Sequence, residues 1–200
     1  MSASSPAITS LEQLQQACSS CALCELAASR THVVVSRGNP EARLMLIGEG
    51  PGQKEDESGR PFVGRAGQLL DRILESVGLS SERDVYICNV VKCRPPGNRK
   101  PAAAEMAACR PWLEAQIKLV DPALIVVAGA TAVEALLGIK GGITKLRGHW
   151  QERDGRQVLP VFHPSYLLRN PSGAEGSPTW HTRKDMQDVR TRLEQEGWQP

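Results

Sequence analysis

Six cysteines are the residues whose type and spacing first suggest chemistry. Cys18 and Cys21 form a CxxC pair, and Cys93 and Cys109 have 15 residues between them. Four thiolates can hold a zinc ion or an iron-sulfur cluster, and the spacing alone does not decide between them. A buried thiol without a ligand is the alternative for any one cysteine, and we expect Cys24 and Cys88 to be such bystanders.

A glycine loop, Gly48-Glu49-Gly50-Pro51-Gly52, offers a second kind of chemistry. Pro51 and the missing final glycine break the GxGxxG pattern, and no Gly-Lys-Ser/Thr follows, so a phosphate cradle is not favoured over a tight turn after a strand. The loop brings small residues and free amides close to Glu49, Glu55 and Asp56. Acidic groups beside such a backbone can orient a water molecule.

The elements that must position these residues follow from hydrophobic periodicity and from glycine and proline breaks. Short apolar runs alternate with helical patterns, which predicts a parallel sheet covered on both faces, an α/β fold of three α/β/α layers. The strands are expected at Leu44–Ile47, Val85–Val91, Leu124–Val127 and Val158–Phe162, and the helices at Ile8–Leu26, Arg65–Val77, Ala102–Val120, Thr131–Leu137 and Trp180–Gln195.

Three unusual segments follow strands in this arrangement: Gly48–Asp56, Asn89–Pro101 and His163–Arg169. In open parallel sheets, ligands bind beyond the carboxyl ends of the strands. We therefore expect the functional site where these three segments meet.

Length and composition limit the class of protein. A chain of 200 residues and 21.7 kDa, 40% hydrophobic, predicts a single domain over 1–200 with a core of about 9–195. The net charge of +2 neither requires nor excludes a polyanionic partner. The longest apolar stretch is too short for a membrane span and no secretory signal is visible, so we expect a cytoplasmic protein with reduced thiols and no membrane partner.

Four motifs together resemble one known family. The chain reads GEGPGQKED at 48–56, GRPFVGRAGQLLD at 59–71, NVVKCRPPGNR at 89–99 and HPSYLLRNP at 163–171. In order and spacing these motifs are similar to those of the family 4 uracil-DNA glycosylases. The resemblance implies a four-stranded parallel sheet between helices, and a structural 4Fe-4S cluster on Cys18, Cys21, Cys93 and Cys109. It also implies hydrolysis of the N-glycosidic bond of deoxyuridine in DNA, which releases uracil and leaves an abasic site.

The resemblance assigns roles to three residues of the pocket. Phe62 matches the position that stacks on the flipped base, and a side chain that only fills the hydrophobic core is the alternative. The amide of Asn89 can accept the N3–H of uracil and donate to its O4, provided that the amide is held against flipping; an Asn that satisfies a turn is the alternative. His163 is expected to donate to uracil O2 as negative charge develops there.

The water and the DNA need further residues. Related families carry Asp or Asn where this chain has Gly50, so we expect Glu49 and the loop backbone to hold the water, while Glu55 shapes the pocket near uracil C5 and excludes the methyl group of thymine. Ser165 is placed to meet a phosphate, and Leu167 or Leu168 to enter the gap left by the flipped base. Expected phosphate contacts are Arg169, Arg94, Arg99, Lys100 and Arg147, for each of which a solvated charge is the alternative.

Other classes of protein fit less well. A non-catalytic iron-sulfur module that binds DNA would not need both Asn89 and His163. A relative that cross-links to uracil-DNA carries an extra His in a basic insertion, whereas this chain reads RPPGNRKPAAAE there. A zinc hydrolase lacks an HExxH ligand set. We expect an enzyme that turns over on uracil-containing DNA as a monomer.

Overall fold

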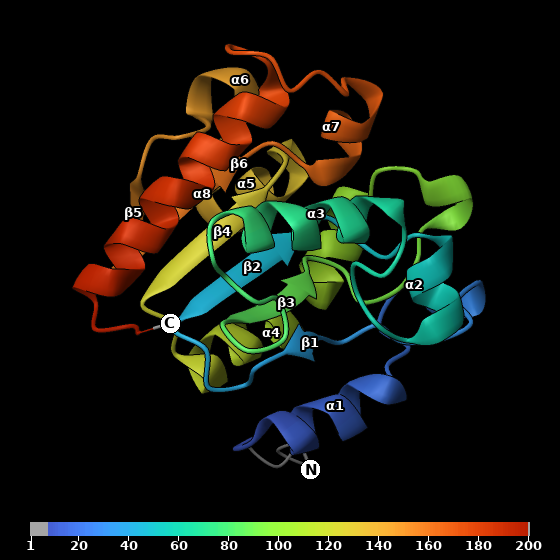
Figure 1. Cartoon of the computed structure of the whole chain (residues 1–200). Helices are drawn as coiled ribbons and strands as arrows, with labels where there is room; N and C mark the ends of the chain where they lie inside the picture. The colour runs from blue at the N-terminus through green and yellow to red at the C-terminus, as the bar shows by residue number, and fades with distance from the viewer. Residues whose placement is uncertain (1–7, 200) are drawn as a thin grey trace.

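The fold is built on a six-stranded sheet in the order β1-β3-β2-β4-β6-β5 (Figure 1). The computed structural model describes residues 8–199. The strands are β1 (Arg37–Gly38), β2 (Leu44–Gly48), β3 (Val85–Asn89), β4 (Leu124–Ala128), β5 (Gln151–Arg153) and β6 (Arg156–Val161). The helices are α1 (Leu11–Ser19), α2 (Gln53–Ser58), α3 (Arg65–Ser76), α4 (Ala103–Val120), α5 (Ala130–Leu137), α6 (Ile143–Leu146), α7 (Pro164–Arg169) and α8 (Pro178–Gln195), with single 3₁₀ turns at Glu25–Ala28 and Pro96–Asn98.

The four central strands, β3-β2-β4-β6, are parallel, as predicted. The prediction of only four strands was wrong at the edges, because β1 and β5 add one antiparallel strand on each side. These strands are two and three residues long, too short to give a periodic signal. A hairpin signal was nevertheless present: Asp154 and Gly155 connect β5 to β6 and both have positive φ (51° and 76°), as in a two-residue hairpin turn.

Alternate residues of the central strands face two separate cores. Leu44 and Leu46 of β2 pack with α3, α7 and α8, whereas Met45 and Ile47 pack with α4 and α5. All five residues of β2 are buried, so both faces of the sheet are covered (Figure 1). This confirms the three-layer α/β/α arrangement. Helix α1 lies outside these layers against α4, through a small cluster around Leu14.

The N-terminal helix is shorter than predicted. One helix over Ile8–Leu26 was expected to carry three cysteines, but α1 begins after its cap Ser10 and ends at Ser19. The Cys21 amide then bonds to the Cys18 carbonyl in a turn. Of the three cysteines, only Cys18 is therefore helical. The turn after α1 brings Cys21 and Cys24 to a cavity that Cys18 also lines.

Short helices follow two of the strands directly. Four residues separate β2 from α2, and two separate β6 from α7. Neither helix was predicted, because six residues are too few for a periodic signal. Val90 and Val91, predicted as strand, lie beyond β3, where their amides bond to the carbonyls of Gly48 and Glu49. Within residues 8–199, no helix is long and apolar enough to cross a membrane.

Candidate active site

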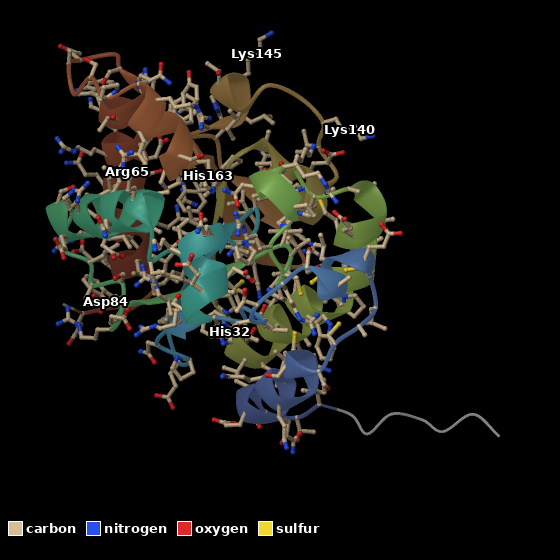
Figure 2. The ribbon with its side chains drawn as sticks, turned by 90° about the vertical axis from the view of Figure 1, so that its right-hand side faces the viewer. His32, Arg65, Asp84, Lys140, Lys145 and His163 are labelled. Carbon is tan, nitrogen blue, oxygen red and sulfur yellow. The ribbon has the colours of Figure 1, made fainter. Side chains whose placement is uncertain are left out.

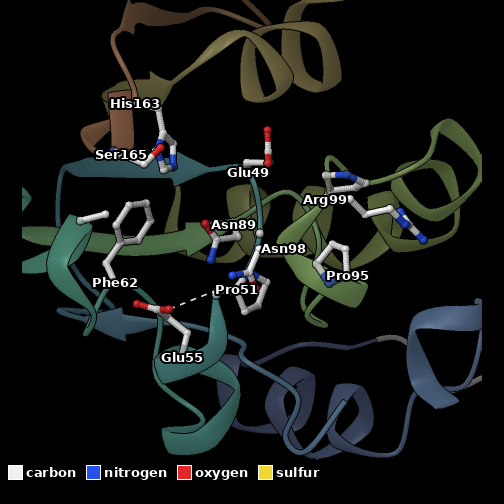
Figure 3. Close-up of a pocket in the computed structure, with 14 residues that line it drawn as sticks. Glu49, Pro51, Glu55, Phe62, Asn89, Pro95, Asn98, Arg99, His163 and Ser165 are labelled. Carbon is white, nitrogen blue, oxygen red and sulfur yellow. Dashed lines mark hydrogen bonds between the residues drawn. The ribbon is translucent and has the colours of Figure 1, made fainter. Parts of the chain in front are cut away.

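A pocket of about 290 Å³ opens at the carboxyl ends of β2, β3 and β6 (Figure 3). This volume lies near the lower end of the range for small-molecule sites, roughly 300–1,000 Å³. The three segments singled out in the sequence all contribute to its lining. Figure 3 shows His163 and Glu55 on opposite sides, with Phe62 and Asn89 between them. The predicted residues that line the pocket are Glu49, Gly50, Glu55, Phe62, Asn89, Arg99, His163 and Ser165.

Asn89 is the last residue of β3 and is 1% exposed. Its side-chain oxygen is buried without a hydrogen-bond partner among the described residues. Buried polar atoms are normally paired, so such an orphan at a pocket wall indicates a place for a ligand donor. The neighbouring strand makes room for it: a Cβ on Gly48 would lie 2.5 Å from Asn89 Oδ1 and 2.4 Å from Phe62 Cζ.

Phe62 lies in the loop before α3 and is only 5% exposed, yet it lines the pocket. Its backbone has φ +55°, a left-handed conformation that is uncommon for a residue other than glycine. Its ring centroid lies 5.9 Å from that of His163, with 34° between the planes. Phe62 is therefore both a packed residue and one face of the pocket.

His163 follows β6 and caps the N-terminus of α7. Its Nδ1 lies 3.2 Å from the Ser165 amide and 2.8 Å from the Ser165 hydroxyl. Since a backbone amide can only donate, Nδ1 accepts and the ring proton resides on Nε2. Burial, aided by the charge of Arg169, lowers the pKa of His163 to about 4, although Glu55 opposes the shift. The imidazole is thus neutral at pH 7 with Nε2–H as its donor.

Glu49 and Gly50 form the first turn after β2. The Glu49 carboxylate lines the pocket and makes no hydrogen bond or ion pair within residues 8–199, so it is available to a water molecule. A Cβ on Gly50 would lie 2.7 Å from Val91 Cγ2, so glycine lets the loop approach the end of β3 closely. Both residues line the pocket, and the role expected for them in holding the water stays a prediction.

The carboxylate of Glu55 binds backbone amides and is not free to react. Oε1 accepts from the amides of Val63 (2.9 Å) and Gly64 (2.7 Å), and Oε2 accepts from the amide of Gly52 (3.1 Å). These bonds tie the start of α2 to the loop that carries Phe62. Glu55 lines the pocket, but its carboxylate is already occupied by the backbone, and its expected role near uracil C5 stays a prediction.

The predicted DNA-contacting residues lie on α7, but two of them are not free. Leu167 is 1% exposed within the core, so its expected entry into DNA was wrong, and the half-buried Leu168 is left for that role. The Ser165 hydroxyl is occupied by His163. Arg169 is exposed and has no ion pair in the described part of the chain. Tyr166, which the sequence analysis passed over, is 37% exposed on the same helix.

Most of the other expected phosphate contacts already have partners. Arg147 holds Asp185 through both carboxylate oxygens, and Arg99 holds Glu105 in the same way. Lys100 pairs with Glu134, and the Arg94 Nε donates to the side chain of Asn98. Arg147 is the least available of them, because its own side chain is only 18% exposed and its partner is buried. Figure 2 shows the exposed cations Arg65, Lys140 and Lys145 on the same view of the molecule as His163, at its periphery, and Lys140 Nζ lies 3.9 Å from Glu134 Oε1.

The four predicted metal-ligating cysteines line one cavity between α1, α4 and the loop after β3. N–H groups point at three of the sulfurs: Trp112 Nε1 lies 3.3 Å from Cys21, Arg30 Nη1 lies 3.4 Å from Cys93, and the Lys92 amide lies 3.3 Å from Cys109. Donors of this kind tune thiolate ligands. No three His, Cys, Asp or Glu side chains within residues 8–199 are placed to hold a single metal ion.

Burial makes these thiols poor anions on their own. It raises the pKa of Cys18 to about 12 and that of Cys109 to about 11. Thiolates in such surroundings need a bound cationic group, and four of them with N–H donors at their sulfurs fit a zinc ion or an iron-sulfur cluster. Cys88 lies outside the cavity as expected, but Cys24 lines it as a fifth thiol.

Lys92 connects the cysteine cavity with the pocket, a role that the sequence analysis missed. It is 1% exposed, and its Nζ lies 2.5 Å from the carbonyl of Asn89, to which it donates. A lysine between apolar runs in NVVKCR was the available signal, because lysine is almost never fully buried without a partner.

Comparison with known proteins now identifies the class. The model of the uracil DNA glycosylase superfamily matches residues 35–190, so the chain belongs to this superfamily. The chain is 51% identical to a type-4 uracil-DNA glycosylase of Thermotoga maritima over 166 residues, 81% of this chain and 85% of that protein. It is 41% identical to a type-4 uracil-DNA glycosylase of Sulfurisphaera tokodaii over 172 residues, 82% of this chain and 78% of that protein.

A more distant relative, a type-5 uracil-DNA glycosylase of Thermus thermophilus, is 36% identical over 147 residues, 64% of this chain and 67% of that protein. Within the superfamily, the chain therefore belongs to the type-4 uracil-DNA glycosylases. This confirms the resemblance drawn from the four motifs.

Proposed function

We propose that this protein is a monofunctional uracil-DNA glycosylase that flips uracil out of DNA and hydrolyses its N-glycosidic bond. One observation carries the proposal: a buried, unpartnered amide oxygen of Asn89 and a neutral imidazole with its proton on Nε2 face the same pocket. An acceptor beside a neutral donor complements the N3–H and the O2 of uracil.

Recognition of the base rests on Asn89 and Phe62. The Asn89 oxygen accepts from N3–H and its NH₂ group donates to O4, whereas cytosine presents the opposite pattern at both atoms. Phe62 stacks on the flipped base, which is worth roughly 1–3 kcal/mol and offsets part of the cost of unstacking. Gly48 supports both contacts, because a larger residue would collide with both side chains.

His163 supplies the rate-giving contact. As the bond between uracil N1 and deoxyribose C1′ breaks, its electron pair leaves with the base and negative charge builds up on O2. A hydrogen bond from Nε2–H then strengthens, and it stabilises the transition state more than the ground state. The Ser165 amide and hydroxyl keep the other ring nitrogen as an acceptor and so keep the proton on the side of the substrate.

Glu49 holds the water whose oxygen forms the new bond to C1′. Its carboxylate is the one in the pocket that the described residues leave unoccupied, whereas that of Glu55 is bound by backbone amides. We expect Glu49→Ala to lower kcat by roughly 100-fold or more, in line with general acid-base contributions. Near-normal uracil release by Glu49→Ala would end this assignment.

Cys18, Cys21, Cys93 and Cys109 hold a 4Fe-4S cluster in this proposal. Their common cavity and the N–H groups directed at three sulfurs support the assignment. When bound, the cluster supplies a structural cross-link between the N-terminal segment and the loop after β3. A visible absorption spectrum of aerobically purified protein tests it, since a colourless, zinc-loaded preparation would overturn it.

The DNA lies over the face that holds the pocket mouth, where Leu168 enters the gap left by the base and Arg169 contacts a phosphate. The exposed Arg169, which has no ion pair within residues 8–199, supports this orientation. Because the substrate is DNA, we place the enzyme in the compartment that contains the genome, in keeping with the cytoplasmic expectation. Its action as one domain over 1–200 and as a monomer stays a prediction, which light scattering and limited proteolysis would check.

An oligonucleotide with one uracil tests the function and its alternative together. After treatment with the protein and then alkali, a cut strand indicates an abasic site and hence a glycosylase. A shifted band that survives denaturing electrophoresis indicates a cross-linking relative. An intact, unshifted strand in every DNA context would indicate a non-catalytic iron-sulfur module and refute the proposal.

A further inference from the structure

Arg37 is a buried cation that neither the motifs nor the proposed chemistry uses. It lies on the edge strand β1, and its side chain is only 4% exposed. A buried guanidinium is costly unless its donors are satisfied. All five N–H donors of Arg37 have acceptors, so the surroundings are built around this side chain.

Two of these donors act on the backbone beside Phe62. Nε donates to the carbonyl of Pro61 (2.9 Å), and Nη2 donates to the carbonyl of Phe62 (3.4 Å). The remaining donors anchor the guanidinium: Nη2 also bonds to Asp71 of α3 (2.6 Å), and Nη1 bonds to Ser81 and Glu82. Arg37 therefore connects β1, the loop before α3 and α3 itself.

The backbone at Phe62 needs such support. Its φ of +55° is unfavourable for a residue with a side chain, and strained residues persist only where the surroundings fix them. From the other side, the Glu55 carboxylate accepts from the amides of Val63 and Gly64. Gly67 of α3 also lies so close that a Cβ on it would be 1.8 Å from the Phe62 carbonyl oxygen.

We propose that Arg37 is a positioning residue of the base pocket, whose guanidinium holds the left-handed turn at Phe62 and thereby the stacking face of the ring. This inference rests on the proposed function. Arg37 acts through Phe62 and does not touch the base. Lysine cannot replace it, because a single ammonium cannot reach both carbonyls and Asp71 in the fixed geometry of a guanidinium.

A double-mutant cycle tests the inference. Complete loss of a base stack corresponds to roughly 5- to 150-fold in affinity, so a displaced ring predicts about 3- to 30-fold lower kcat/KM for Arg37→Met on uracil-DNA. In the Phe62→Ala background the same substitution should change kcat/KM by less than about 2-fold, since the group through which it acts is gone. Losses that multiply in the double variant would overturn the inference.

Two further variants serve as controls for correct folding. Arg37→Lys keeps a charge between Asp71 and Glu82, and its kcat/KM should also fall by a factor that vanishes in the Phe62→Ala background. Arg43→Met removes a matched positive charge from an exposed ion pair with Glu196 and should leave kcat/KM unchanged. Thermal melts of all variants establish that kinetics are compared between folded proteins.

Failure of the proposed function and failure of the positioning role of Arg37 give different results. If the wild-type protein released no uracil from any DNA, the proposed function would fall. The turn itself would still be tested by amide hydrogen exchange: the Val63 and Gly64 amides should exchange faster in Arg37→Lys than in Arg43→Met. Equal exchange in these two variants would overturn the positioning role without reference to activity.

Discussion

Protonation of His163 gives a stability change that depends on pH in a defined direction. The folded protein lowers the pKa of His163 to about 4 from an ordinary value of 6.5, chiefly because the ring is buried. Between these two pH values the unfolded chain binds the proton and the folded chain does not. The free energy of unfolding must therefore rise with pH across this window and fall as the solution is acidified from pH 6.5 toward 4.

The size of the effect follows from the two pKa values. Their separation corresponds to a loss of about 3 kcal/mol at most on acidification through the window. The structure gives the physical reason, because a proton on Nδ1 would face the Ser165 amide at 3.2 Å and remove the hydrogen bond from that amide, while the Ser165 hydroxyl would have to change from donor to acceptor. Above pH 6.5 both states are neutral, and His163 adds no further pH dependence.

Urea denaturation at pH 7.5 and at pH 4.5 measures this difference. His163→Gln cannot titrate in the window, so the wild-type protein should lose about 2–3 kcal/mol more than this variant on acidification. His149→Gln, at an exposed histidine, should follow the wild-type protein. Equal losses in the wild-type protein and in His163→Gln would refute the assignment of an imidazole that stays neutral in the folded protein below pH 6.5.

Activity provides a second check on the same protonation state. If neutral His163 donates through Nε2–H, kcat/KM for uracil release should pass through pH 6.5 without an inflection due to this residue. A basic limb with a pKa near 6.5 that disappears in His163→Gln would instead mean that the imidazolium is the active form, contrary to the geometry at Ser165.

Three further results are expected. Asn89→Asp should lower uracil release by roughly 10- to 100-fold in a single-turnover gel assay, because a carboxylate opposite O4 loses the donor; activity within 2-fold of wild type would contradict this. Leu168→Ala should lose more activity on duplex than on single-stranded uracil-DNA, since only the duplex leaves a gap to fill; equal losses would exclude Leu168 from that role. Cys93→Ser should lose the visible absorption of the cluster while Cys88→Ser keeps it, and loss in both would show that the spectrum reports on folding alone.

The sequence predicted the central sheet and the location of the site because both depend on local patterns. Each central strand is a short apolar run, and the pocket residues stand directly after strands, as Asn89 does after β3 and His163 after β6. Once parallel strands are assigned, the geometry of the sheet brings these ends together. The glycine loop at Gly50 was located by the same reasoning.

Side-chain partners could not be predicted in this way. Leu167 and Leu168 are adjacent in the sequence and equally apolar, yet the first is buried in the core and the second is only half-buried. Which of them faces inward depends on where α7 sits on α3, a contact between distant segments. The sequence around Arg147 likewise does not distinguish it from a solvated cation, because its partner Asp185 lies on the distant helix α8.

Glu55 shows how a residue in a diagnostic motif can serve the site indirectly. A carboxylate next to a glycine loop is a natural choice for a reactive group, and nothing local to residues 48–56 reveals that Val63 and Gly64 will bind it. The same loop receives Arg37 from the opposite side, so an anion holds its amides and a cation holds its carbonyls. Because opposite charges fix opposite ends of the Phe62 turn, the ring is held in place before any base arrives, and binding need not include the cost of ordering it.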